Sequence, residues 1–219
     1  MITQTEHLDD LKEIRTIMER SSRFISLSGL TGVFAGTLAL LGALSVYLYK
    51  QDYFLGRYFS RGVFESSQVL STLELRNLVV FLLSTACIVL FLSLGFGILF
   101  TTRNARRKGL PIWDSTVKRM LINLFIPLAA GGIFCLALLY HHQIYLVAPA
   151  TLVFYGLALI NTSKYTLNDI RYLGIAEVIL GLTSMFFAGY SLIFWAVGFG
   201  IIHIVYGTTM YWKNERINR

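Results

Sequence analysis

The sequence predicts an all-α membrane protein with six transmembrane helices, arranged as three hairpins, behind a cytoplasmic amphipathic helix. Three observations predict this fold. Of the 219 residues, 55% are apolar and 14% are charged, whereas a soluble domain carries about 25% charged residues. The apolar residues gather in long segments, and the charges lie almost entirely between them. Because hydrocarbon offers the backbone no hydrogen-bond partner, such segments are expected to be helical.

Six segments are long enough to cross a hydrocarbon layer of about 30 Å, which takes about 20 residues. They are Phe24–Tyr49, Leu78–Thr102, Met120–Tyr140, Ile144–Thr162, Tyr172–Tyr190 and Ser191–Trp212. Together they form one predicted transmembrane domain, residues 24–212, followed by a cytoplasmic tail, residues 213–219. A single helix over residues 172–212 would be about 60 Å long, so we predict a tight turn at Gly189–Tyr190–Ser191.

The distribution of Lys and Arg predicts the orientation, because cytoplasmic loops retain positive charge. If the amino terminus lies inside, 15 of the 19 basic residues face the cytoplasm and 4 lie outside. The densest group, six basic residues within residues 103–119, decides the count. Both termini are therefore predicted to be cytoplasmic.

Residues 1–23 are predicted to form an amphipathic helix, because apolar residues recur there every three or four positions among charged ones. This helix could lie on the inner membrane surface, cover the cytoplasmic mouth of the bundle, or bind a cytoplasmic protein partner; surface packing is favoured. The apolar run that begins at Phe24 is too long for a cleavable signal and is expected to remain as an anchor. The outer connection, residues 50–77, is rich in aromatic residues, and its conformation stays open between a helical extension and an interfacial helix.

Glu177 and His203 are the strongest candidates for a site, because ionisable side chains are costly inside a membrane. They lie about 9 and 15 Å from the cytoplasmic ends of their spans, so adjacent antiparallel helices would bring them together. A hydrogen bond between them would allow either a charged pair or a neutral pair that shares one proton. The favoured interpretation is polar contact between helices, with Tyr206 and Asn123 as further candidate members; the alternative is a proton or substrate site.

Small residues at four-residue spacing in the first span, Ser28, Gly32 and Gly36, predict a close approach of two helices. Packing against another span of the same chain is favoured over dimerisation, and an oligomer stays open as the alternative.

Several classes of function find no support in the sequence. The basic run of residues 103–108 lacks interleaved aromatic residues, so no nucleic acid is expected as a partner. Cys87 and Cys135 lie within apolar runs, and the adjacent His141 and His142 have no third ligand nearby in sequence, so no metal or disulfide is predicted. Neither a phosphate-binding glycine motif nor a Gly-x-Ser-x-Gly sequence occurs. The chain is therefore predicted to be no enzyme and to need no cofactor.

Two stretches, RSSRFISLSGLTGVFAG (Arg20–Gly36) and FWAVGFGIIHIVYG (Phe194–Gly207), resemble segments of small, uncharacterised multi-pass membrane proteins of bacteria. The resemblance implies a bacterial inner membrane and no particular activity. Two functions are then expected from the sequence. The first is a non-enzymatic scaffold or sensor embedded in the lipid bilayer, and the alternative is a small proton-coupled transporter or channel that uses Glu177 and His203.

Overall fold

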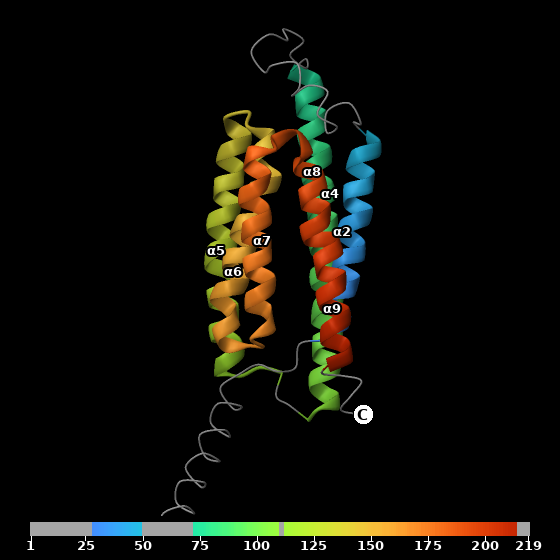
Figure 1. Cartoon of the computed structure of the whole chain (residues 1–219), viewed down its shortest axis with the longest axis vertical. Helices are drawn as coiled ribbons and strands as arrows, with labels where there is room; N and C mark the ends of the chain where they lie inside the picture. The colour runs from blue at the N-terminus through green and yellow to red at the C-terminus, as the bar shows by residue number, and fades with distance from the viewer. Residues whose placement is uncertain (1–27, 50–71, 110–111, 214–219) are drawn as a thin grey trace, which may run out of the picture.

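The computed structural model describes residues 28–49, 72–109 and 112–213, and within them the chain is helical, without strands (Figure 1). The helices are α2 (Gly29–Tyr49), α4 (Thr72–Arg107), α5 (Ser115–Tyr140), α6 (Val147–Thr162), α7 (Asp169–Phe186), α8 (Ser191–Trp195) and α9 (His203–Tyr211). Short 3₁₀ turns lie at Ile144–Leu146, Ser163–Tyr165 and Ala188–Tyr190, and a π-helical segment, η4 (Ala196–Ile202), joins α8 to α9. The expected amphipathic helix of residues 1–23, most of the outer connection and the end of the tail lie outside the described residues.

Five of these helical segments are long and apolar enough to cross a membrane: Gly29–Tyr49, Arg76–Arg107, Ser115–Tyr140, Ile144–Tyr165 and Ser191–Tyr211. The segment predicted as the fifth span is also helical, as α7, but three of its 18 residues are charged, namely Asp169, Arg171 and Glu177. The observed helices differ from the predicted spans mainly at their ends. The second predicted span, for example, is part of a longer helix that begins at Thr72 and ends at Arg107.

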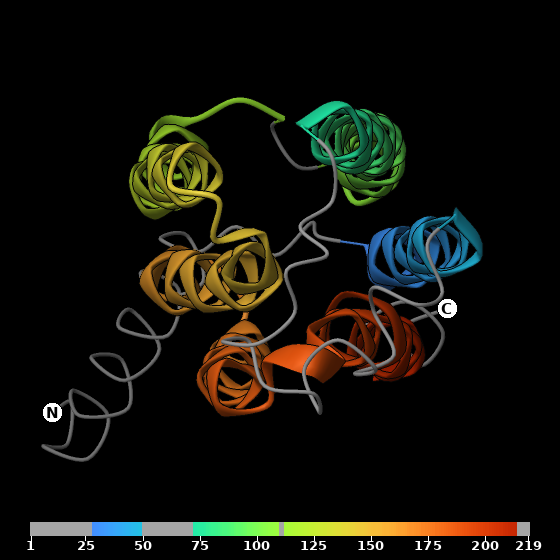
Figure 2. The same cartoon turned by 90° about the horizontal axis from the view of Figure 1, so that it is seen from above.

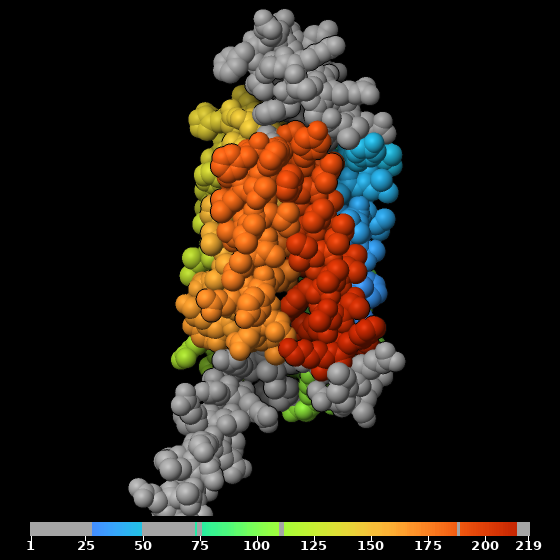
Figure 3. Space-filling view, viewed as in Figure 1, coloured from blue at the N-terminus to red at the C-terminus, as the bar shows by residue number. Residues whose placement is uncertain are grey.

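The helices run up and down in succession and fall into two groups (Figures 1 and 2). In one group, α6 lies between α5 and α7; in the other, α2 lies between α4 and the final rod of α8, η4 and α9. The rod, which comes last among the described helices, thus packs in the same group as α2 and α4, the first two of them. The two groups meet where α8 and η4 contact α6 and α7, and Figure 3 shows α7 and α9 side by side with a hollow between them.

Glycine residues set the close contact between α2 and α9. A Cβ atom on Gly207 would lie 2.6 Å from both the carbonyl oxygen of Gly29 and the amide nitrogen of Val33. Farther along the same interface, a Cβ atom on Gly36 would lie 2.6 Å from the carbonyl oxygen of Gly200, and one on Gly32 would lie 3.0 Å from Cα of Gly207. The small residues of the first span thus face another helix of the same chain, and Ser28 is buried at the start of that face.

A second glycine interface joins α6 to α7. A Cβ atom on Gly156 would lie 2.6 Å from the carbonyl oxygen of Gly174, and one on Gly181 would lie 2.9 Å from the carbonyl oxygen of Pro149. The backbones of α6 and α7 can approach this closely because no side chain stands between them. As a result α7 packs most closely against α6, whereas the expected third hairpin would have paired it with the rod that follows.

The outward faces of α4 and α5 are apolar and exposed. Phe91 on α4 is 70% exposed, and Phe125 on α5 is 68% exposed. Large exposed apolar areas are unusual on a soluble monomer. Together with the five apolar helices, they indicate a membrane location for the protein.

Candidate functional site

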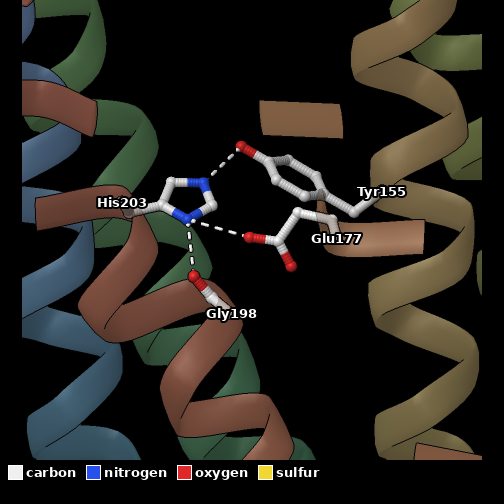
Figure 4. A network of polar contacts seen from close by, with 4 residues as sticks. All are labelled: Tyr155, Glu177, Gly198 and His203. Carbon is white, nitrogen blue, oxygen red and sulfur yellow. Dashed lines mark hydrogen bonds and ion pairs between the residues drawn. The ribbon is translucent and has the colours of Figure 1, made fainter. Parts of the chain in front are cut away.

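Glu177 and His203 lie together at the junction of the two helix groups (Figure 4). Oε1 of Glu177 is 3.3 Å from Nδ1 of His203, and the side chains are 0% and 7% exposed. Glu177 comes from α7, and His203 is the first residue of α9. The two ionisable residues that the sequence places at similar depths are therefore neighbours in the structure.

Gly198 provides the space for the carboxylate. A Cβ atom at this position would lie 2.5 Å from Oε2 of Glu177 and 2.6 Å from Cδ2 of Leu152. Both neighbours are fully buried. A side chain at position 198 would therefore collide with Glu177 or with Leu152. The glycine thus allows α7 and η4 to meet with Glu177 between them.

The π-helical segment η4 ends immediately before His203. Such segments are rare and are frequently found at functional sites. Nδ1 of His203 lies 3.0 Å from the carbonyl oxygen of Gly198, five residues earlier. The imidazole ring is thereby attached to the backbone of its own helix as well as to α7.

The contacts of the imidazole determine which nitrogen carries a proton. A carbonyl oxygen can only accept a hydrogen bond, so Nδ1 must be the donor to Gly198. Nε2 lies 2.9 Å from the hydroxyl oxygen of Tyr155, which can either donate or accept. When His203 is neutral, Tyr155 donates to Nε2; when His203 is charged, Nε2 donates to Tyr155.

Aromatic rings surround the imidazole. The ring of Phe199 stacks with that of His203 at a centroid distance of 5.8 Å, and the ring of Tyr155 lies 5.4 Å away. Phe199 also contacts Tyr155 and Trp195, with ring centroids 4.9 and 5.0 Å apart. This apolar surrounding strengthens electrostatic interactions within the site, because few dipoles are available to screen them.

The carboxylate of Glu177 is incompletely satisfied. Oε1 is within ion-pair distance of His203, yet neither carboxylate oxygen accepts a well-aligned hydrogen bond from any residue that the structure describes. Buried polar groups nearly always have hydrogen-bond partners, and exceptions require an explanation. A carboxylate held in this way is a potential proton acceptor.

The other two predicted site residues differ in their positions. Tyr206 packs in a cluster next to the site with Leu159, Ile170 and Leu173, and its hydroxyl is buried without a hydrogen-bond partner among the described residues. Asn123 is bound elsewhere: its carbonyl oxygen and Oδ1 accept hydrogen bonds from Nδ2 of Asn161, at 2.9 and 3.2 Å. Asn123 thus joins α5 to α6, and this corrects the grouping of Asn123 with the pair.

Tyr155 and Gly198 contribute to the site although the sequence analysis did not select them. A tyrosine within an uncharged span resembles an ordinary packing residue. Its depth is the signal that could have identified it, because Tyr155 lies nine residues before Lys164, or about 13 Å along a helix. That depth is close to the depths of Glu177 and His203.

Comparison with known proteins provides no relative: no family model, curated protein or solved structure matches the chain. Across the described part of the chain, no group of three or more His, Cys, Asp or Glu residues is arranged to hold a metal ion. The fold and the site define an all-helical protein whose apolar helices are compatible with a membrane.

Proposed function

We propose that the protein is a six-span integral protein of a bacterial inner membrane that carries protons across it, with Glu177 and His203 as the proton-binding pair. The observation that supports this most directly is the carboxylate of Glu177, which is fully buried and, among the described residues, is paired only with a histidine. Carboxylates within membrane spans are rare and mark proton or ion pathways. The scaffold hypothesis depends on the amino-terminal helix, which lies outside the described residues.

The position of charges along α7 supports its assignment as the fifth of six spans, in addition to the five apolar helical segments. Asp169 and Arg171 occupy its first turn, and Glu177 lies six residues beyond Arg171. The helix has 18 residues, about 27 Å at 1.5 Å per residue, which is close to the hydrocarbon thickness. Two of its three charges would therefore lie at the cytoplasmic interface, and only Glu177 would lie in the hydrocarbon.

The proposed topology predicts which residues a membrane-impermeant thiol reagent reaches. In a background with Cys87 and Cys135 replaced by serine, Arg106→Cys and Lys213→Cys should react only after the inner face is made accessible. His141→Cys, at the opposite end of the bundle, should react in intact cells. Labelling of the Arg106 and Lys213 positions from opposite faces would contradict the six-span arrangement.

The arrangement suits reversible protonation because the site has two stable proton distributions. When an additional proton is on Nε2 of His203, both imidazole nitrogens are protonated; the Nδ1 proton can then pass to Oε1 of Glu177, 3.3 Å away, while Nε2 keeps its own. The first distribution is an ion pair and the second is a neutral pair. If the contact were purely structural, the unsatisfied carboxylate oxygen would bring no benefit. Leaving a buried acceptor without a hydrogen-bond donor costs about 1–3 kcal/mol or more.

Glu177→Gln is expected to abolish proton transport, because glutamine preserves the shape of the side chain but its amide does not take up a proton at physiological pH. The measurement is proton uptake into proteoliposomes that contain a pH-sensitive dye, driven by a potassium gradient with valinomycin. Wild-type vesicles should acidify faster than protein-free vesicles, and the Glu177→Gln vesicles should match the protein-free ones.

Thr183→Val is the matched control, because Thr183 lies on the same helix and its hydroxyl bonds only to the carbonyl of Ile179 within that helix. It should retain the wild-type rate. A wild-type rate equal to that of protein-free vesicles would contradict proton transport. A Glu177→Gln rate equal to the wild-type rate would remove Glu177 from the pathway.

A further inference from the structure

We propose that Tyr155 is the proton relay that connects the Glu177–His203 pair to the cytoplasmic side, with Tyr206 as the next hydroxyl along the route. This inference rests on the proposed function. It assigns a route where the proposed function assigns only the binding pair.

Tyr155 provides the polar group that contacts Nε2 of His203. Nδ1 is occupied by Gly198 and faces Glu177, while Phe199 lies against the ring. The hydroxyl of Tyr155 is 2.9 Å from Nε2, a normal hydrogen-bond distance. A proton that enters or leaves Nε2 therefore passes through the hydroxyl of Tyr155.

Tyr206 extends this contact toward the end of the bundle where α7 begins and α9 ends. It packs in the same cluster as Tyr155. Its hydroxyl is buried and has no hydrogen-bond partner among the described residues. At that end, Nζ of Lys213 forms an ion pair of 2.9 Å with Oδ2 of Asp169, and both side chains are exposed. The proposed route therefore runs from the buried pair through Tyr155 and Tyr206 toward this exposed ion pair, with water molecules bridging the groups that are not in hydrogen-bond contact.

The transfer leaves no charge on the tyrosine. As Nε2 of charged His203 releases its proton, the hydroxyl oxygen of Tyr155 forms a new O–H bond and its original O–H bond breaks. The departing proton passes to the hydroxyl of Tyr206 or to a water molecule, and from there to the carboxylate of Asp169 or to bulk water. Rotation of the Tyr155 hydroxyl then restores the hydrogen bond that it donates to neutral His203.

In the opposite direction along the bundle, an apolar side chain lies next to the site. Leu152 is fully buried on that side and contacts Gly198 at the site. Ser184 is the next buried hydroxyl on α7, and no described residue forms a hydrogen bond with it. It lies seven residues from Glu177, about 10 Å along the helix, so a single proton transfer cannot reach it.

The test follows protonation in time. Wild-type protein in nanodiscs is subjected to a pH jump, and the infrared band of the protonated Glu177 carboxyl group is recorded; Glu177→Gln identifies this band by its loss. Tyr155→Phe is expected to slow the appearance of the band about tenfold or more, within the range for a lost proton-transfer group. The final amplitude of the band should be retained. Tyr206→Phe should slow it in the same way.

Tyr172→Phe is the matched control, because Tyr172 lies on α7 and is 71% exposed; it should leave the rate unchanged. An unchanged rate in Tyr155→Phe, with the band still lost in Glu177→Gln, would overturn the relay and leave the proton-binding pair intact. Slower protonation in Ser184→Ala with a normal rate in Tyr206→Phe would place the route on the opposite side and also overturn the proposal. Absence of a band that depends on Glu177 would instead contradict the proposed function.

Discussion

Gly207→Val is expected to separate α2 from α9 and to lower the free energy of unfolding by about 3 kcal/mol, at the upper end of the usual cost of overpacking. The first atom of the new side chain would lie 2.6 Å from backbone atoms of Gly29 and Val33. Backbone atoms cannot rotate away as the end of a side chain can, so the helices themselves must move. The measurement is unfolding in detergent, followed by circular dichroism as a denaturing detergent is added.

Gly132→Val on α5 controls for the effect of valine on a helix, because no described atom beyond the surrounding backbone of α5 lies within 4 Å of a Cβ atom at Gly132. It should unfold near the wild-type midpoint. If Gly207→Val and Gly132→Val unfold at the same denaturant concentration, the contact between α2 and α9 does not hold the bundle together.

The helices themselves could be predicted because apolarity along a segment is a local property. Which helices pack together could not. Gly32 and Gly36 predict a close approach to some helix, but the partner is determined by glycines 160 or more residues later, at Gly200 and Gly207. Similarly, the most apolar stretch of 18 residues in α4 is more apolar than that in α2, yet it is far less buried. Apolarity alone does not separate a surface that faces other helices from one that faces lipid.

The site could be predicted in part. Similar depth predicts that Glu177 and His203 are neighbours, and this depends only on counting residues from charged ends. The π-helical segment could not be predicted in the same way, because it changes the register of the helix after Gly198 without an evident sequence signal. The hydrogen bond from His203 to the Gly198 carbonyl depends on that register. Tyr155 was not predicted as a site residue because it lies on α6, which carries no charged residue. Nothing in that span therefore indicated a polar site at its depth.

His203→Leu is expected to destabilise the protein by about 3–5 kcal/mol, the usual cost of removing one member of a buried ion pair. The substitution preserves much of the side-chain volume but leaves Glu177 fully buried without its partner. The hydrogen bonds to Gly198 and Tyr155 are lost at the same time. The midpoint of unfolding in detergent should fall well below that of the wild type.

The double substitution Glu177→Leu with His203→Leu separates this effect from a loss of packing. Because both polar groups are then removed, the cost of burying an unpaired charge disappears, and the double variant is expected to be more stable than His203→Leu alone. Such a recovery, combined with loss of proton transport, would mean that the pair is retained for its chemistry and not for the stability of the fold. If the stability lost by the double variant equals the sum of the losses in the two single variants, the two residues are not coupled. The ion pair between them would then contribute neither to the stability of the fold nor to proton transport.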